Sequence, residues 1–256
     1  YHGFEDYRGG GHFSGRITAA LVAAGGIIIP ALEGIGISLA THIAKCAGVS
    51  DRKFGDLESD IKSLNAKSFP VLDDARGEEM AQRILKAREE ADSVGGVTET
   101  VICGTPAGVG EPWFDSVESV ISHAAFSLGG VKGVEFGAGF AAADMKGSEC
   151  NDPLRVSDGR IVTTTNNNGG VNGGITNGMP IVFRCAVKPT PSIAQTQDTV
   201  DFMKNENTQL SIHGRHDPAI IRRICPVLDS VAALCVADML SLRYGTDVLT
   251  KGVDDK

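Results

Sequence analysis

Four short segments of this sequence combine glycine, hydroxyl and basic residues. The first covers residues 8–18 (RGGGHFSGRIT), where two arginines flank glycines and Ser14. Glycines let backbone N–H groups approach an oxyanion, and a serine that caps a helix places the positive end of the helix dipole beside it. The segment therefore favours phosphate binding. A glycine turn followed by an ordinary helix cap explains the same residues.

The second segment, 166–178 (NNNGGVNGGITNG), is rich in asparagine and glycine. It matches neither the dinucleotide-binding G-x-G-x-x-G pattern nor a phosphate loop with Gly-Lys-Ser/Thr. Its glycines favour close packing against a flat ligand or another backbone. The alternative, a flexible loop, is disfavoured because Gly173 and Gly174 lead directly into an apolar strand.

The third and fourth segments each hold a cation on a proline-stiffened turn. In 188–192 (KPTPS), two prolines fix a lysine and two hydroxyls in a workable phosphate clamp, although a strand-ending turn is the simpler alternative. In 214–218 (GRHDP), Arg215 can pair with a phosphate while Asp217 handles a proton. An internal Arg–Asp salt bridge, with Asp217 as a helix cap before Pro218, is compatible with the same residues.

Composition and charge limit the class of protein. The chain has 256 residues, 42% of them hydrophobic, with 32 glycines and 10 prolines, which excludes a disordered or fibrous protein and favours one domain over residues 1–256. There are 24 basic and 32 acidic residues, a net charge of −8, which disfavours nucleic acid as a partner. A few converging arginines can still bind a small anionic substrate.

Cysteines, histidines and apolar runs give no competing chemistry. The six cysteines lack zinc-ligand spacing and are expected to be buried free thiols in a reducing, cytoplasmic compartment, and no metal site is expected. Four histidines are expected to be structural: His2, His42, His123 and His213. The apolar stretch 19–32 contains Pro30 and is shorter than the ~20 residues of a membrane span, so we expect no membrane association.

The periodicity of the chain predicts an α+β protein with antiparallel sheets covered by helices. Helices are expected over 18–24, 74–91 and 220–244, with another capped by Asp115. Strands are expected over 34–43, 98–104, 131–145, 160–165 and 180–187, with a hairpin across 200–212. Residues 50–75 are expected to form a polar excursion.

Six motifs, in order and covering nearly the whole chain, together resemble chorismate synthase. They are Arg8-Gly9-Gly10-Gly11 with Ser14-Gly15-Arg16-x-Thr18; Gly108-Val109-Gly110-Glu111-Pro112-x-Phe114-Asp115; Val131-Lys132-Gly133-Val134-Glu135-Phe136-Gly137-x-Gly139-Phe140; Gly169-Gly170-x-x-Gly173-Gly174-Ile175-x-Asn177-Gly178; Lys188 to Ser192; and Gly214 to Pro218. The resemblance implies a β-α-β sandwich with antiparallel sheets and long helices, usually assembled as a homotetramer.

The resemblance also implies a reaction and its cofactor. Chorismate synthase is a lyase of the shikimate pathway of aromatic amino acid biosynthesis. It converts 5-enolpyruvylshikimate 3-phosphate to chorismate by 1,4-anti elimination of phosphate, using reduced FMN, with NADPH as a candidate reductant. The flavin sits near subunit contacts in this family.

Site residues follow from the matched motifs. The resemblance implies flavin contacts from His12, Phe13, Ser14, Gly129, Gly130, Gly173, Lys188, Pro189, Thr190, Pro191, Ser192 and Arg215. It implies substrate contacts from Arg16 and Arg215, and catalytic roles for Ser14 and for Asp217, the latter assisting deprotonation. The family more often has Arg-Ser-Ser at residues 12–14, so this chain departs from the pattern at His12 and Phe13.

The two catalytic histidines of the family lie in a Ser-His-Gly motif and a Pro-Gly-His-Ala-Asp motif, and this sequence contains neither. We expect both upstream of Tyr1, so that the chain is N-terminally incomplete and, if nothing precedes Tyr1, has little activity. The alternatives are another flavin- or phosphate-dependent lyase, and a catalytically incompetent form that only binds ligand or oligomerises.

Overall fold

A five-stranded antiparallel sheet forms the centre of the protein. The computed structural model describes residues 10–157, 159–212, 214 and 216–253. The strand order is β2-β1-β3-β9-β4, and every neighbouring pair is antiparallel. The bounds are β1 Ser38–Cys46, β2 Val49–Ser50, β3 Gly96–Cys103, β4 Val131–Phe136 and β9 Ile181–Val187.

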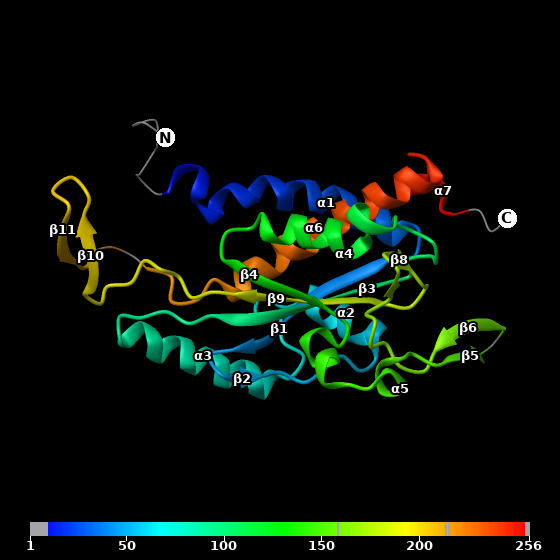
Figure 1. The fold of residues 1–256 in the computed structure, drawn as a ribbon, viewed down its shortest axis with the longest axis horizontal. Coiled ribbons are helices and arrows are strands. Elements are labelled where there is room, and N and C mark those ends of the chain that lie inside the picture. Colours follow the sequence, from blue (N-terminus) through cyan, green and yellow to red (C-terminus); the bar gives the residue numbers. More distant parts are fainter. Residues whose placement is uncertain (1–9, 158, 213, 215, 254–256) are drawn as a thin grey trace.

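Three helices cover one face of this sheet (Figure 1): α1 Ala19–Gly34, α4 Val117–Phe126 and α6 Ile221–Tyr244. The first helix is longer than the expected range of 18–24, because α1 continues through Gly25, Gly26 and Pro30. Packing explains the difference at Gly25, where a Cβ would collide with Ser230 of α6. The glycine allows the two helices to approach closely, and their contact offsets its low helix propensity.

Two further helices lie on the opposite face, α2 Leu57–Asn65 and α3 Asp74–Glu89. The polar excursion expected over 50–75 therefore contains a helix. Asp56 caps α2 by accepting a hydrogen bond from the Ser59 N–H, and Ile61 and Leu64 of α2 are buried beside Ala40 of β1. The polar and charged residues around these two apolar positions hid the helical spacing.

Short elements complete the described chain. Three hairpins have their own two-stranded sheets: β5 Leu154–Ser157 with β6 Arg160–Thr163, β7 Val171–Asn172 with β8 Ile175–Thr176, and β10 Gln197–Asp201 with β11 Glu206–Leu210. The first and last project at opposite ends of the molecule (Figure 1). Helices α5 Gly147–Cys150 and α7 Val248–Lys251 and the 3₁₀ turns η1 Gly11–Phe13, η2 Gly15–Thr18, η3 Trp113–Asp115 and η4 Gly139–Asp144 connect the rest.

The α+β class with antiparallel sheets is confirmed, and several boundaries are corrected. The strand expected over 131–145 ends at Phe136 and is followed by η4. Helix α4 is capped by Ser116 rather than Asp115, because the Ser119 N–H bonds to the Ser116 hydroxyl. His123 is exposed, which contradicts a buried structural role.

Two helices in the described part of the chain are long and apolar enough to cross a membrane by length and composition. They are Gly15–Gly34, which is mostly exposed, and Ile221–Tyr244, which is mostly buried as the core helix of a globular protein would be. The argument that the first apolar stretch is too short for a span is therefore wrong, because the helix begins earlier and continues through Pro30.

Candidate functional site

Three of the predicted site segments meet at the C-terminal end of α4. The backbone N–H of Lys188 donates to the Gly130 carbonyl over 2.9 Å. A Cβ added to Gly129 would lie 3.9 Å from the Phe13 carbonyl oxygen, and one added to Gly130 would lie 2.9 Å from Ile220 Cδ1. Residues before α1, after α4 and after β9 therefore share one end of the sheet.

Residues 188–192, which we call the strap, contact the segment before β3 on one side and are exposed on the other. The Ser93 hydroxyl donates to the Thr190 carbonyl over 2.7 Å, and a Cβ on Gly95 would lie 2.9 Å from Pro189 Cδ. Lys188, Pro191 and Ser192 are exposed. The Thr190 hydroxyl is buried and has no hydrogen-bond partner in the described structure, which is unusual for a polar atom out of contact with solvent.

The first segment forms a cap beside this strap. The Ser14 hydroxyl accepts hydrogen bonds from the Arg16 backbone N–H and from Arg16 Nη1, both over 3.2 Å. Ser14 thus caps η2, which leads directly into α1, as the sequence predicted for a helix beginning there. His12 and Arg16 are exposed, and Phe13 has 62% of its surface exposed.

Asp217 lies next to the same end but makes a different ion pair from the one anticipated. Its Oδ2 lies 2.6 Å from Arg223 Nη1, and the neighbouring Pro218 carbonyl accepts from the Val94 N–H over 2.8 Å. Asp217 is not the cap of α6, which begins four residues later at Ile221. Arg215, predicted to contact substrate and flavin, lies outside the described residues, as do His2 and His213.

Gly173 is the predicted site residue that the structure does not bring to this end. It forms the tip of the β7–β8 hairpin with φ +60°, and nothing lies within 4 Å of the position of its absent Cβ. The next carbonyl, of Gly174, accepts from the Val117 N–H over 2.9 Å, at the N-terminal end of α4. The ten residues of α4 put roughly 15 Å between the two ends.

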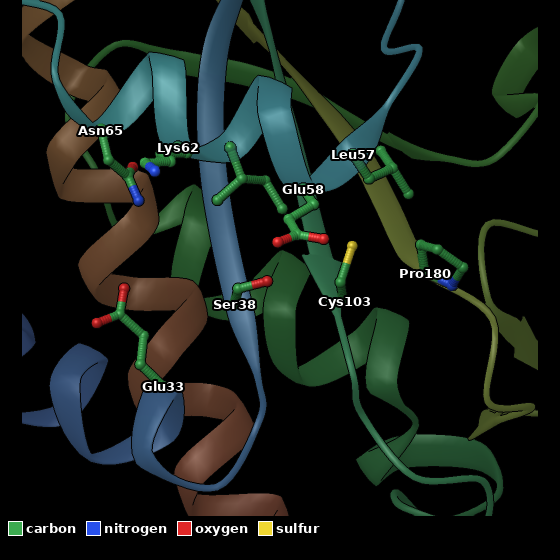
Figure 2. Close-up of a pocket in the computed structure, with 9 residues that line it drawn as sticks. Glu33, Ser38, Leu57, Glu58, Lys62, Asn65, Cys103 and Pro180 are labelled. Carbon is green, nitrogen blue, oxygen red and sulfur yellow. The ribbon is translucent and has the colours of Figure 1, made fainter.

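A hollow of about 740 Å³ lies elsewhere, between α2, the end of α1, the start of β1 and the end of β3 (Figure 2). Ser38, Glu58 and Cys103 line its middle in this view, with Glu33 and Lys62 farther out. No predicted site residue lines it. Burial raises the pKa of the Cys103 thiol to about 11, so this cysteine stays protonated near neutral pH and is a poor nucleophile.

A row of charged side chains crosses the sheet on its α2 face, and sequence reasoning missed it. His42 on β1, Glu99 on β3, Arg184 on β9 and Glu135 on β4 are neighbours in register. Arg184 bonds Glu99 over 3.0 Å and Glu135 over 2.6 Å, and His42 bonds Glu99 over 3.3 Å. The available signal was the presence of a charged or titratable residue in each of four expected, otherwise largely apolar strands.

His42 ends this ionic row inside the protein. Burial alone would lower its pKa, but its hydrogen bonds to Asp51, over 2.9 Å, and to Glu99 outweigh burial and raise the pKa. Asp51 in turn accepts from the Leu72 and Asp73 N–H groups. The expectation of a structural role for His42 fits this setting, and the row joins β1, β3, β9 and β4 laterally.

An antiparallel sheet between helices, with glycines, hydroxyls and exposed cations gathered at one end, defines an α+β protein suited to binding a small anion. The sequence profile described as "Chorismate synthase" matches residues 1–241. The chain belongs to the chorismate synthase family.

Individual relatives agree with this assignment. A chorismate synthase of Pyrococcus abyssi is 45% identical over 95% of this chain and 67% of its own length, and one of Chitinophaga pinensis is 48% identical over 98% of this chain and 66% of its own. A solved structure titled "Crystal Structure of Chorismate Synthase" superposes with a TM-score of 0.74 at 28% identity, covering 91% of this chain and 66% of that one. The chain thus spans about two thirds of the length of these relatives, which are phosphate-eliminating lyases.

The residues gathered at the C-terminal end of α4 fit a phosphorylated flavin. The unpaired Thr190 hydroxyl is a free hydrogen-bonding group, and Lys188 supplies an exposed positive charge two residues before it. Gly129 and Gly130 keep the adjacent backbone free of side chains. These groups suit a phosphate and the edge of a flat ring.

Proposed function

We propose that this chain provides the flavin- and substrate-binding part of a chorismate synthase, acting on 5-enolpyruvylshikimate 3-phosphate with reduced FMN. The observation that carries the proposal is the meeting of the residues beside Ser14, Gly129–Gly130 and the 188–192 strap at one end of the sheet, where the strap carries a buried hydroxyl without a partner in the described structure, that of Thr190. Nothing in the comparisons favours a catalytically incompetent form.

The electrostatics of the reaction match this end of the protein. The elimination breaks the carbon–oxygen bond to phosphate, so phosphate leaves with the electron pair while a ring hydrogen is lost and a new C=C bond forms. The leaving group is a dianion, and fixed cations stabilise such charge. Lys188 and Arg16 are exposed at this end and supply positive charge to the anions that bind here.

Asp217 is proposed to assist the proton transfer, with Arg223 as the residue that orients it. The contact of 2.6 Å between the two side chains fixes the carboxylate at the start of the last helix. FMN, when bound, would supply the reduced flavin that the family's reaction requires, and NADPH is the proposed source of its electrons. We place the protein in the cytoplasm, without membrane or nucleic-acid partners.

Self-association is part of the proposal, because Gly173 lies at the far end of α4 from the other residues. A homotetramer, usual in the family, would allow the Gly173 hairpin of one copy to approach the strap of another. Within one copy the Gly173 hairpin and the strap lie at opposite ends of α4, and this separation supports a site shared between copies.

Removal of the Thr190 hydroxyl gives the sharpest test. Thr190→Val keeps the shape of the side chain and should weaken FMN binding about 5- to 20-fold, in line with ~1–2 kcal/mol for one hydrogen bond. The unfolding midpoint should not fall, since the hydroxyl has no partner to lose. Titration of the chain with reduced FMN, followed by flavin fluorescence or calorimetry, measures the affinity.

Thr199→Val, on the exposed β10 strand, is the matched control and should leave FMN binding unchanged. Equal affinities for Thr190→Val and the unaltered chain would contradict the proposed site. Release of phosphate from the substrate in the presence of reduced FMN distinguishes a lyase from a chain that only binds. Binding of flavin without this substrate would indicate a different flavin-dependent lyase.

A further inference from the structure

Three asparagines of the segment 166–178 are each followed by a glycine: Asn168, Asn172 and Asn177. In such a pair the backbone nitrogen of the glycine can reach the side-chain carbonyl of the asparagine, because glycine has no Cβ to keep them apart. Attack at this carbonyl closes a five-membered ring and releases ammonia, which makes asparagine a thermolabile residue. The reaction requires a mobile side-chain amide and a glycine nitrogen that is free to attack.

The fold restrains Asn168 against this reaction. Its backbone N–H and its Nδ2 donate to Asp152 Oδ2 over 2.9 and 2.8 Å, so that one carboxylate holds both groups. The glycine nitrogen is engaged as well, since the Gly169 N–H donates to the Asn166 carbonyl over 3.0 Å, and Gly169 is buried. Ring closure at Asn168 would therefore break hydrogen bonds of both reacting groups at a buried position.

Asn177 is restrained at both ends of its side-chain amide. Its Oδ1 accepts from the Met179 N–H over 2.9 Å, and its Nδ2 donates to Asn172 Oδ1 over 2.7 Å. The residue is half-buried, although Gly178 is exposed. Rotation of the amide toward the Gly178 nitrogen would break both hydrogen bonds, so we expect Asn177 to react slowly.

Asn172 is the least restrained of the three. Both Asn172 and Gly173 are exposed at the tip of the β7–β8 hairpin. Strand pairing ends with Asn172 opposite Ile175, so the pairing does not use the Gly173 N–H, and nothing lies within 4 Å of the position of the absent Gly173 Cβ. The Asn172 amide accepts the hydrogen bond from Asn177, and its own Nδ2 has no partner within the described residues. Ring closure at Asn172 therefore breaks fewer contacts than at the other two sites.

We propose that Asn172 is a site of spontaneous modification, which converts this asparagine to a succinimide and then, with water, to aspartate and isoaspartate. The Gly173 nitrogen forms a bond to Asn172 Cγ and the Cγ–Nδ2 bond breaks. The electron pair of the broken bond leaves with ammonia, which also takes the proton of the attacking nitrogen. Water then opens the ring at either of its two carbonyls. No atom changes its oxidation state.

The β7–β8 hairpin transmits this change to the start of α4. The Gly174 carbonyl accepts from the Val117 N–H over 2.9 Å, and the Thr176 hydroxyl donates to the Pro106 carbonyl over 2.6 Å. These bonds join the hairpin to α4 and to the loop after β3. Isoaspartate lengthens the main chain by one methylene beside a two-residue turn, whose geometry is narrowly defined, and so displaces these contacts. Aspartate adds only a charge to an exposed side chain.

Peptide mapping by mass spectrometry tests the choice of site, because each conversion replaces an NH₂ group by OH. The flavin-free chain is incubated at pH 8, folded in one sample and unfolded in guanidinium chloride in the other. In the folded chain Asn172 should convert at least about 10-fold faster than Asn168 and Asn177, whereas the three rates in the unfolded chain should agree within about 3-fold, since each pair contains the same glycine. Asn172→Gln should stop conversion at this position and leave the other two rates unchanged, because the longer side chain has to close a six-membered ring.

Thermal unfolding of the converted protein tests the consequence. Ion exchange separates the converted chains by their added charge, and electron-transfer fragmentation distinguishes isoaspartate from aspartate. The unfolding midpoint of the isoaspartate form should fall by about 2–4 °C. Asn172→Asp carries the charge without the extra methylene and should keep its midpoint within about 1 °C of the unaltered chain.

Four results would overturn the proposal: equal rates at the three asparagines of the folded chain, faster conversion at Asn168 or Asn177, no conversion at Asn172, or an unchanged midpoint of the isoaspartate form. All these measurements use the flavin-free chain and do not depend on the proposed function. The FMN affinity of Thr190→Val concerns the flavin site alone, so the two proposals fail independently.

Discussion

The two faces of the five-stranded sheet bury polar groups in opposite ways. Toward α2, the charged row His42–Glu99–Arg184–Glu135 pairs each member with an opposite charge. At its two ends, His42 bonds the Asp51 carboxylate and Glu135 accepts a hydrogen bond from the Phe140 N–H. On the α6 face, the Thr41 and Thr100 hydroxyls lie 2.7 Å apart. Asp229 of α6 forms hydrogen bonds with Thr41, and no cation contributes to the shift of its pKa.

On the α6 face, Asp229 is a buried carboxyl without a paired cation, and its pKa is raised as a result. Within the described structure its Oδ1 is buried without a hydrogen-bond partner. Burial raises the pKa of Asp229 to about 7, and hydrogen bonds with Thr41 offset only part of that shift. One face therefore keeps its carboxylates ionised by pairing them, while the other holds a carboxyl that gains a proton near neutral pH.

The largest effect is expected from breaking the paired face. Arg184→Met removes the cation between Glu99 and Glu135 and leaves two partly buried carboxylates side by side. The free energy of unfolding should fall by about 3–5 kcal/mol in a urea titration at pH 7. Arg83→Met, which removes an exposed helical pair with Glu79, should cost less than about 1 kcal/mol.

The triple variant Arg184→Met, Glu99→Gln, Glu135→Gln separates charge from packing. It should recover much of the stability lost in Arg184→Met, because no unpaired charge remains near the row. If Arg184→Met cost no more than Arg83→Met, the row would contribute nothing beyond an ordinary surface pair.

The unpaired face should respond to pH. Because the pKa of Asp229 is higher in the folded protein than the ordinary 3.8, the folded state holds more protons between about pH 4 and 7. Its stability relative to the unfolded state therefore falls as pH rises through this range, and the full penalty persists above pH 7. Asp229→Asn should remove this dependence and stabilise the protein at pH 8 by about 2–4 kcal/mol.

The exposed Asp238, on the same helix, is the control, since Asp238→Asn should leave the pH profile of stability unchanged. Urea unfolding at several pH values between 4 and 8 gives the comparison. Parallel profiles for Asp229→Asn and the unaltered chain would mean that Asp229 is already ionised in the folded protein.

The smallest effect concerns how closely the helices pack on the α6 face. Gly25→Ala would place a methyl group against Ser230 and should cost about 1–2 kcal/mol by pushing α1 from α6. Gly26→Ala, where nothing lies within 4 Å, should instead add up to about 1 kcal/mol through helix propensity. Thermal unfolding of both variants measures these changes, and the unfolding midpoint should fall for Gly25→Ala and rise for Gly26→Ala. Equal shifts of the midpoint would show that Gly25 is not a close-contact position.

Periodicity predicted the parts of the fold that one pattern governs. The 3.6-residue spacing of α3 and α6 and the apolar runs of β3 and β9 gave elements within a few residues of their observed bounds. Local rules failed where tertiary contacts decide: α1 survives Pro30 because it packs on α6, and Asp56 starts a helix in a segment too polar to look helical. Apolar residue type did not fix burial either, since Leu242 near the end of α6 is 79% exposed while Leu240 is fully buried.

The candidate site was predictable as a set of segments but not as an arrangement. Glycine and cation content identified the 8–18 and 188–192 segments, and residues 13 and 188 both lie beside Gly129 and Gly130 at one end of the sheet. Nothing local showed that the Gly173 hairpin joins the opposite end of α4, or that Asp217 pairs with Arg223 six residues later. The ionic row depends on strand register, which single-strand patterns do not give.

Strand β9 is bonded along both edges, to β3 over residues 96–102 and to β4 over residues 131–136. The strap 188–192 continues from its last residue and is held by two further hydrogen bonds, from the Lys188 N–H to the Gly130 carbonyl and from the Ser93 hydroxyl to the Thr190 carbonyl. Lys188 and Thr190 are therefore tethered to a strand that is paired on both sides, and a ligand held by them meets groups that are already in position.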